Sequence, residues 1–187
     1  AAAGATVLWR PSYEDIYPAQ IAKLSAGKLG EKFEGVHRPG HFDGVLTVVN
    51  RLFELVKPKY AIFGEKDFQQ LFLITKMAAQ LHPEIEIISA PTVRETSGLA
   101  MSSRNVRLDE SGRKSSLIIS KSLNENSITE MQKVLATEPG FTLDYLEIID
   151  EDTFLPATSD SKNKRAIIAG WVNGVRLLDN KRMGATA

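Results

Sequence analysis

The chain has 187 residues, 43% of them hydrophobic and 25% charged, and its 23 basic and 23 acidic residues leave no formal net charge. This composition is typical of a globular protein of one ordinary or two small domains. The neutral balance disfavours a nonspecific nucleic-acid binder, which would usually be basic. The absence of cysteine excludes disulfides and thiolate metal sites and fits a reducing compartment. Because no apolar run is long enough to span a bilayer, we expect a cytoplasmic protein that binds neither membrane nor nucleic acid.

Before residue 60 the pattern predicts one long helix and two short elements. Residues 5–9 are a weak strand candidate, and residues 13–17 are expected to form a short helical turn. From residue 42 to residue 56, apolar side chains recur at helical spacing, and Lys57-Pro58 stops the helix.

The next stretch predicts a βαβ unit. Residues 60–63 are short, apolar and aromatic, as expected of a buried strand, and Gly64 ends it. Asp67 can cap a helix that runs to residue 81, and the isoleucines of residues 84–90 indicate a second strand. Strand, helix and strand in so short a span predict a right-handed crossover in a parallel sheet.

After Pro91 the character of the sequence changes, and we place a domain boundary there. Residues 92–105 are polar and precede a predicted helix over 108–124, which Asp109 can cap. Ser127-Ile-Thr-Glu130 is a capping-box pattern that opens a second, shorter helix.

The last part of the chain predicts three strands, over residues 143–149, 166–172 and 175–178. Asn173-Gly174, between the last two, is a strong hairpin signal. Helices followed by an antiparallel hairpin indicate a small α+β unit over residues 92–187.

Two polar segments are candidates for a phosphate site. Gly64-Glu-Lys-Asp67 lies between a strand and a helix, where free backbone N–H groups and the positive helix end point at a ligand. Lys66 adds a mobile charge there. Met101-Ser-Ser-Arg-Asn105 offers two hydroxyls and a guanidinium that can grip phosphate oxygens. Each segment also has an ordinary interpretation, an exposed turn followed by solvated Gln69 and Gln70 in the first case, and a polar interdomain linker in the second.

Together the two segments resemble the pantothenate synthetase family, ligases that join pantoate to β-alanine with ATP. The matching stretches are Arg38-Pro-Gly-His-Phe42, Phe63-Gly-Glu-Lys-Asp-Phe-Gln-Gln70, Gly98-Leu-Ala-Met-Ser-Ser-Arg-Asn105 and Leu177-Leu-Asp-Asn180. Their order and spacing fit along nearly the whole chain. The resemblance implies an α/β fold. Residues 1–91 would be the C-terminal portion of a Rossmann-like ATP- and pantoate-binding domain, and residues 92–187 a small α+β domain with the Met101–Arg104 phosphate loop.

The resemblance also implies the reaction. The pantoate carboxylate attacks the α-phosphate of Mg-ATP, giving pantoyl adenylate and pyrophosphate, and the amine of β-alanine then displaces AMP. ATP and Mg²⁺ are the implied cofactors, pantoate and β-alanine the substrates, and a homodimer the implied assembly. The magnesium would ride mainly on the ATP phosphates, because histidines and carboxylates do not cluster at ligand spacing in this sequence.

Site residues are implied position by position. The residues that would neutralise phosphate charge in catalysis are Lys66, Ser102, Ser103 and Arg104. The same four residues, with Gly64, Glu65, Asp67, Val93 and Met101, would form the nucleotide site. In it, Gly64 and Asp67 would hold the ribose, and Val93 and Met101 would contact the adenine region. Gln70 would hydrogen-bond pantoate. Arg38 and His41 either border the pantoate site or fix the Gly40 turn, and His82 is expected to be exposed.

One departure from the family is large. Its N-terminal segment, with a His-x-x-His signature and the first strands of the sheet, has no counterpart in these residues. We therefore expect this chain to be a fragment or an incomplete record of the enzyme that cannot turn over alone. Two alternatives stay open: another adenylate-forming or nucleotidyl-transferring enzyme of the same superfamily, and a non-catalytic module that serves only in assembly.

Overall fold

The computed structural model describes residue 4 and residues 6–19 and 21–184. The chain packs into two compact units. The first unit takes in the described residues up to Ala61 together with Leu73–Ile87, and the second takes in Ile62–Phe72 together with the described residues from Ile88 onward. The domain boundary near Pro91 stays a prediction.

The first unit begins with short helices whose ends follow from local chemistry. Its elements are α1 (Tyr13–Ile16), η1 (Gly27–Glu31), α2 (Glu34–His37) and α3 (His41–Val56). A capping box opens α1, because the Ser12 hydroxyl accepts from the Asp15 N–H at 3.1 Å while the Asp15 carboxylate accepts from the Ser12 N–H at 2.8 Å. The long helix α3 ends at Lys57, whose φ of 47° breaks the helical backbone as the sequence predicted.

Two expectations about this unit are wrong. Residue 5 of the predicted strand lies outside the described residues, and Thr6–Trp9 form no strand, because no described segment pairs with them. His82 is buried rather than exposed, with only 8% of its surface accessible. It follows α4 (Phe68–Leu81) directly and packs on α3, where its Nε2 lies 2.7 Å from Asn50 Oδ1 and its ring meets Phe53 edge-on.

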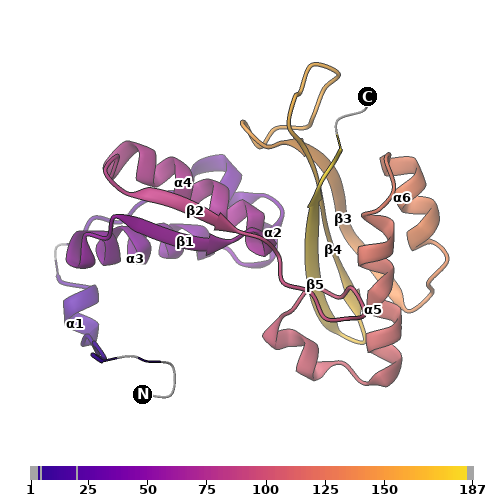
Figure 1. Ribbon diagram of the computed structural model, residues 1–187, viewed down its shortest axis with the longest axis horizontal. Helices are drawn as coiled ribbons and strands as arrows, with labels where there is room; N and C mark the ends of the chain where they lie inside the picture. Colours follow the sequence, from indigo (N-terminus) through magenta and orange to yellow (C-terminus); the bar gives the residue numbers. More distant parts are fainter. Residues whose placement is uncertain (1–3, 5, 20, 185–187) are drawn as a thin grey trace. The chain divides into compact units, whose positions relative to one another are not determined.

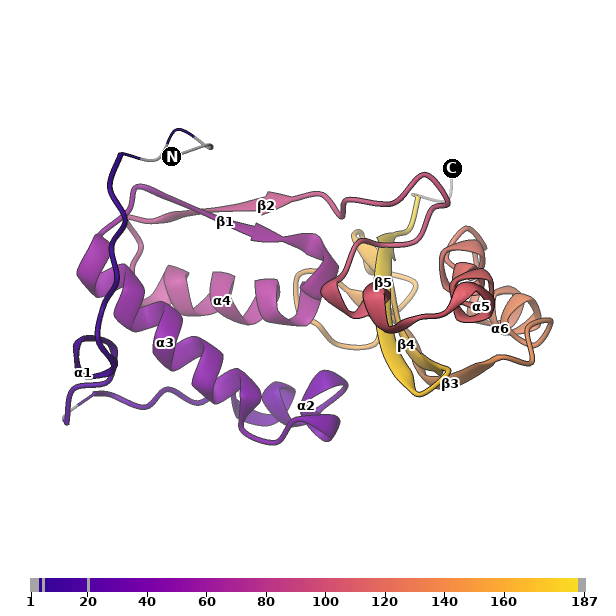
Figure 2. The same cartoon turned by 90° about the horizontal axis from the view of Figure 1, so that it is seen from below.

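The predicted βαβ unit is present. Strand β1 (Tyr60–Gly64), the short turn η2 (Glu65–Asp67), α4 and strand β2 (Glu86–Ala90) follow one another, and the two strands pair as a parallel sheet (Figures 1 and 2). The expectation that β1 is buried is wrong, since Tyr60 is 49% and Ile62 67% exposed. In the described chain β1 has a single partner strand, and its alternate side chains face outward without cover.

The second unit contains an antiparallel sheet covered by two helices. Its strands β3 (Phe141–Asp150), β4 (Lys164–Val172) and β5 (Val175–Arg182) lie in the order β3-β4-β5, and α5 (Glu110–Ser122) and α6 (Ile128–Leu135) pack on one face (Figure 1). Among the most buried core residues are Ile119, Met131, Ala166, Ile168 and Val172.

Local predictions in this unit are confirmed with one difference, at the start of α6. The Asp109 carboxylate accepts from the Gly112 N–H at 2.7 Å and caps α5. Ser127 caps α6 by accepting from the Glu130 N–H at 3.2 Å, but in place of the reciprocal backbone bond of a capping box its hydroxyl donates to the Glu130 carboxylate at 2.9 Å. Asn173 and Gly174 adopt φ values of 48° and 73° and join β4 to β5 in a tight hairpin. Within the described part of the chain, no helix combines the length and hydropathy that crossing a membrane requires.

Candidate functional site

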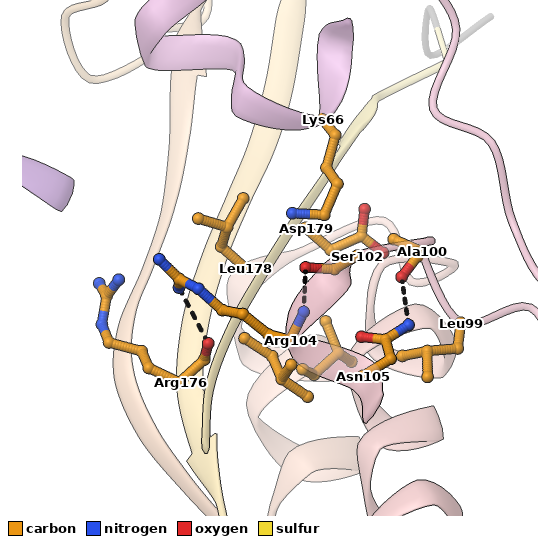
Figure 3. A pocket seen from close by; sticks show the side chains of 11 residues that line it. Lys66, Leu99, Ala100, Ser102, Arg104, Asn105, Arg176, Leu178 and Asp179 are labelled. Carbon is orange, nitrogen blue, oxygen red and sulfur yellow. Dashed lines mark hydrogen bonds between the residues drawn. The ribbon is translucent and has the colours of Figure 1, made fainter. Parts of the chain in front are cut away.

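One pocket of the second unit brings the two predicted phosphate segments together. Lys66 reaches it from η2, and Ser102 and Arg104 reach it from the start of η3 (Ser103–Arg107) (Figure 3). The opposite wall comes from β5, which supplies Arg176 and Asp179. Residues far apart in the sequence therefore meet at one polar site.

The loop that carries Ser102 is a tied hairpin of the second unit rather than an interdomain linker. Gly98 turns it with a φ of 92°, and the Met101 N–H donates to the Val93 carbonyl at 2.9 Å. The Asn105 amide donates to the Glu95 carboxylate at 3.0 Å and to the Ala100 carbonyl at 3.1 Å. These bonds close the loop and fix where η3 begins.

Ser102 sits at the start of η3 in an extended conformation. Its hydroxyl accepts from the Arg104 N–H at 3.2 Å, which is the geometry of an N-cap. The Arg104 guanidinium donates from Nη1 to the Arg176 carbonyl at 3.0 Å, and this bond lays the side chain along β5 (Figure 3).

Two of the charged residues that line the pocket form ion pairs, and two form none with a described residue. Asp179, whose side chain is 3% exposed, pairs with Arg94 through two bonds of 2.6 and 3.0 Å. Arg176 pairs with Asp144 at 2.6 Å. Across the described residues, neither the Lys66 ammonium nor the Arg104 guanidinium forms an ion pair. Two positive charges thus remain available to an anion at this site.

Asn105, which lies in η3, adds a hydrogen-bond acceptor to the lining of the pocket. The residue is 3% exposed, and its Oδ1 is buried without a hydrogen bond from any described group. Its amide orientation is set by the two bonds that Nδ2 donates. A buried acceptor of this kind can take a hydrogen bond from a ligand or a water molecule.

The remaining residues predicted for the nucleotide site do not line this pocket. Gly64, Asp67 and Ser103 are exposed, and Val93 and Met101 are 66% and 54% exposed. The Glu65 carboxylate lies 3.4 Å from the Arg165 guanidinium. The roles assigned to these residues stay predictions.

The two glutamines at the start of α4 differ in burial. Gln69 is 6% exposed, so the interpretation of solvated glutamines is wrong for this residue, which the start of α4 turns inward. Gln70 is partly exposed, and its amide has no hydrogen bond to a described residue.

Arg38 and His41 lie in the first unit on either side of Gly40, where the His41 N–H donates to the Arg38 carbonyl at 3.0 Å. That bond joins backbone groups, so whether the two side chains fix the turn or border pantoate stays a prediction.

Sequence reasoning missed the residues that support the pocket. Arg94, Asp144 and Arg176 gave no signal as candidates. Asp179 and Asn180 belong to the Leu177–Asn180 stretch, which was the available signal, but no role was assigned to them. Among the residues described, no three His, Asp or Glu side chains gather closely enough to hold a metal ion.

Comparison with known proteins identifies the family. A family model for pantoate-beta-alanine ligase matches residues 1–182. The pantothenate synthetase of Chlorobium chlorochromatii is 42% identical, with 98% of this chain and 69% of that protein covered. The pantothenate synthetase of Pelodictyon phaeoclathratiforme is 40% identical, with 98% and 71% covered.

Solved structures agree with this assignment. The pantothenate synthetase of Thermus thermophilus superposes with a TM-score of 0.86 at 38% identity, covering 96% of this chain and 70% of that one. The pantoate-beta-alanine ligase of Francisella tularensis, solved in complex with beta-gamma ATP and beta-alanine, gives 0.69 at 31% identity over 90% and 61%. From the matched residues, the relatives and the fold together, this chain belongs to the pantoate–β-alanine ligase family, ligases of pantothenate biosynthesis.

Proposed function

We propose that this protein condenses pantoate with β-alanine in an ATP-dependent, two-step reaction that passes through pantoyl adenylate. Membership of the ligase family supports the overall condensation. The ligase of Francisella tularensis was solved with an ATP compound and β-alanine bound, which supports the nucleotide and the amine substrate.

In the first step a carboxylate oxygen of pantoate attacks the α-phosphorus of ATP. A phosphorus–oxygen bond forms to pantoate, and the bond from the α-phosphorus to the oxygen bridging it to the β-phosphate breaks, releasing pyrophosphate. In the second step the neutral amine of β-alanine attacks the acyl carbon. The bond between the acyl carbon and the bridging oxygen breaks, and AMP leaves with that oxygen. The amine nitrogen loses a proton, and the product is the amide, pantothenate.

The observation that carries the proposal is a pocket lined by two cations, Lys66 and Arg104, that form no ion pair with any described residue. Phosphoryl transfer asks a protein chiefly to position the phosphates and to neutralise the charge that develops on them. Lys66 and Arg104 would supply that charge, and Ser102 and Ser103 would supply hydroxyl donors. The committed carboxylate of Asp179 does not cancel the cations, because Arg94 holds it at 2.6 Å.

The other binding roles follow the same proposal. Gly64, Glu65 and Asp67 would contact the nucleotide next to Lys66, with Gly64 and Asp67 on the ribose. Val93 and Met101 would cover the adenine with apolar side chains that are exposed in this structure. Gln70 would form a hydrogen bond with pantoate. Arg38 and His41 would either border pantoate or fix the Gly40 turn.

Magnesium, a homodimer and a cytoplasmic location belong to the proposal as well. Magnesium prefers oxygen ligands and readily uses substrate phosphates, so it does not need a dedicated protein cage.

The test is a product assay on the protein at its natural length. AMP and pantothenate should form together only when ATP, pantoate and β-alanine are all present. Labelled pyrophosphate should exchange into ATP when pantoate is present and β-alanine is omitted, because that exchange reverses the first step. Release of ADP, or exchange that does not need pantoate, would refute the adenylate route.

A further inference from the structure

The turn that carries Lys66 is held by one side chain from the far end of the chain. Asn180, in β5, donates from Nδ2 to the Glu65 carbonyl at 2.9 Å and to the Lys66 carbonyl at 2.9 Å. Both donors of the amide are therefore used on consecutive carbonyls of η2. Asn180 is 4% exposed, so these bonds form away from bulk water.

Two further hydrogen bonds fix the orientation of Asn180 itself. Its Oδ1 accepts from Nη1 of Arg165, and its backbone N–H donates to the Asp179 carboxylate at 2.8 Å. Arg165 is 4% exposed and cannot move freely, because it pairs with Glu151 at 2.6 Å and stacks its guanidinium 4.1 Å above the Phe68 ring. A buried amide with all of its hydrogen-bonding groups engaged has a single orientation.

Arg165 also reaches the turn directly. Its guanidinium lies 3.4 Å from the carboxylate of Glu65, the residue before Lys66. Strand β4, through Arg165, and strand β5, through Asn180, thus hold the backbone and the first side chain of η2. The Lys66 side chain is left unpaired by any described residue and extends into the pocket (Figure 3).

A lysine side chain has a flexible four-carbon stem and sets little direction of its own. Fixing the backbone from which it starts is therefore the main way to aim its ammonium group. A displacement of about 1 Å in a catalytic group can cost about 10²-fold in rate. The carbonyls of Glu65 and Lys66 are the groups whose position decides that starting point.

We infer that Asn180 is a positioning residue for Lys66, which it aims by clamping the carbonyls of Glu65 and Lys66, and that Arg165 orients the clamp. This inference rests on the proposed role of Lys66 in phosphate binding. It assigns to the Leu177–Asn180 stretch a function in the reaction although Asn180 does not line the pocket.

The decisive experiment is a double-mutant cycle on the protein at its natural length. Asn180→Asp keeps the size of the side chain and an acceptor for Arg165, but it sets a carboxylate against two carbonyl oxygens. Alone it should lower kcat on the order of 10- to 10²-fold, as expected of a misplaced group. In a Lys66→Ala background it should lower kcat by less than about 2-fold, because the group it positions is already gone.

The control and a second variant keep the result interpretable. Asn124→Asp makes the same change of charge at an exposed amide that accepts from Lys181, and it should leave kcat unchanged. If Asn180→Asp does not fold, Asn180→Ala removes both donors without adding a charge and enters the same cycle. An equal loss of kcat with and without Lys66 would assign Asn180 a purely structural role and overturn the inference.

A second readout does not depend on activity. Hydrogen exchange of a peptide that covers residues 62–70 should speed up at least 10-fold in the Asn180 variants and not in Asn124→Asp. Unchanged exchange there would overturn the clamp. If the parent protein forms no pantothenate, the proposed function fails while exchange still decides whether Asn180 holds the turn.

Discussion

Lys66→Ala tests the central electrostatic argument. The substitution removes one of the two cations in the pocket that form no ion pair with a described residue, and it leaves the backbone of η2 and the Asn180 bonds to its carbonyls in place. The fold should therefore survive, and the effect should fall on the chemical step.

The size of the effect follows from the surroundings of Lys66. Two unit charges 4 Å apart interact by about 1 kcal/mol in bulk water and by about 4 kcal/mol at an effective dielectric constant of 20. The side chain is partly buried and lines a polar pocket, so the upper part of this range applies. Loss of one such donor typically costs about 10²–10³ in kcat. We expect a loss of that order.

The assay is steady-state formation of AMP and pantothenate, with kcat and the KM for ATP measured for each variant. Lys66→Met, which keeps the length of the stem, separates charge from packing and should behave like Lys66→Ala. Lys114→Ala removes a lysine whose side chain is 74% exposed on α5, and it should leave kcat unchanged. A loss of less than a few-fold for Lys66→Ala would make Lys66 an ordinary solvated turn residue and refute the reasoning.

Three further outcomes are expected. Gln70→Ala should raise the KM for pantoate more than the KM for ATP, and equal changes in steady-state kinetics would count against its assignment. Burial alone would raise the pKa of Glu151, but hydrogen bonds and charge from two arginines outweigh it and hold the pKa below its ordinary value. A carboxyl with a lowered folded pKa stabilises the protein above its unfolded pKa of about 4.3, and that stability is lost as the pH falls. Glu151→Gln should therefore flatten the acid side of a urea-midpoint profile, and parallel profiles would contradict this. Gly170→Ala would place a Cβ 2.2 Å from Phe141 Cζ and should lower the free energy of unfolding by roughly 1–3 kcal/mol in urea titration, with Gly184→Ala, in open space, as the control.

Elements with a local signal were predictable from the sequence. The Asn173-Gly174 hairpin, the Asp109 cap and the helix after Asp67 each depend on residues within a few positions of one another. Burial was less predictable, because it depends on what packs against an element. Residues 60–63 form the predicted strand, but Tyr60 and Ile62 are exposed because no described element covers the face of the strand on which they lie.

The prediction for His82 was wrong in the opposite sense, since this residue was expected to be exposed and is buried, and the reason is again tertiary packing. Nothing near it in the sequence indicates that Asn50, 32 residues earlier, offers a buried hydrogen-bond partner at 2.7 Å. Polar residues at helix ends are normally exposed, and tertiary packing reverses that expectation here. Pattern reasoning places a residue on an element but does not say which other element covers it.

The candidate site likewise contains residues that a local pattern predicted and residues that it did not. Lys66, Ser102 and Arg104 were identified from two short segments, and the structure brings them to one pocket. The side chains that support them lie far away in the sequence, since Asn180 is 114 residues from the carbonyl of Lys66 that it binds. The candidate phosphate-binding residues carry a local sequence pattern, whereas the side chains that support them can come from any element that the fold brings near.

The charge of the pocket depends on one of these distant supports. Asp179 lines the pocket opposite Lys66, and an unpaired carboxylate there would attract the ammonium and repel a phosphate. Arg94, 85 residues away in the sequence, prevents this by binding both carboxylate oxygens of Asp179 and the Gly98 carbonyl. The same arginine therefore contributes both to the closure of the loop that presents Ser102 and, by pairing with Asp179, to the positive charge of the pocket.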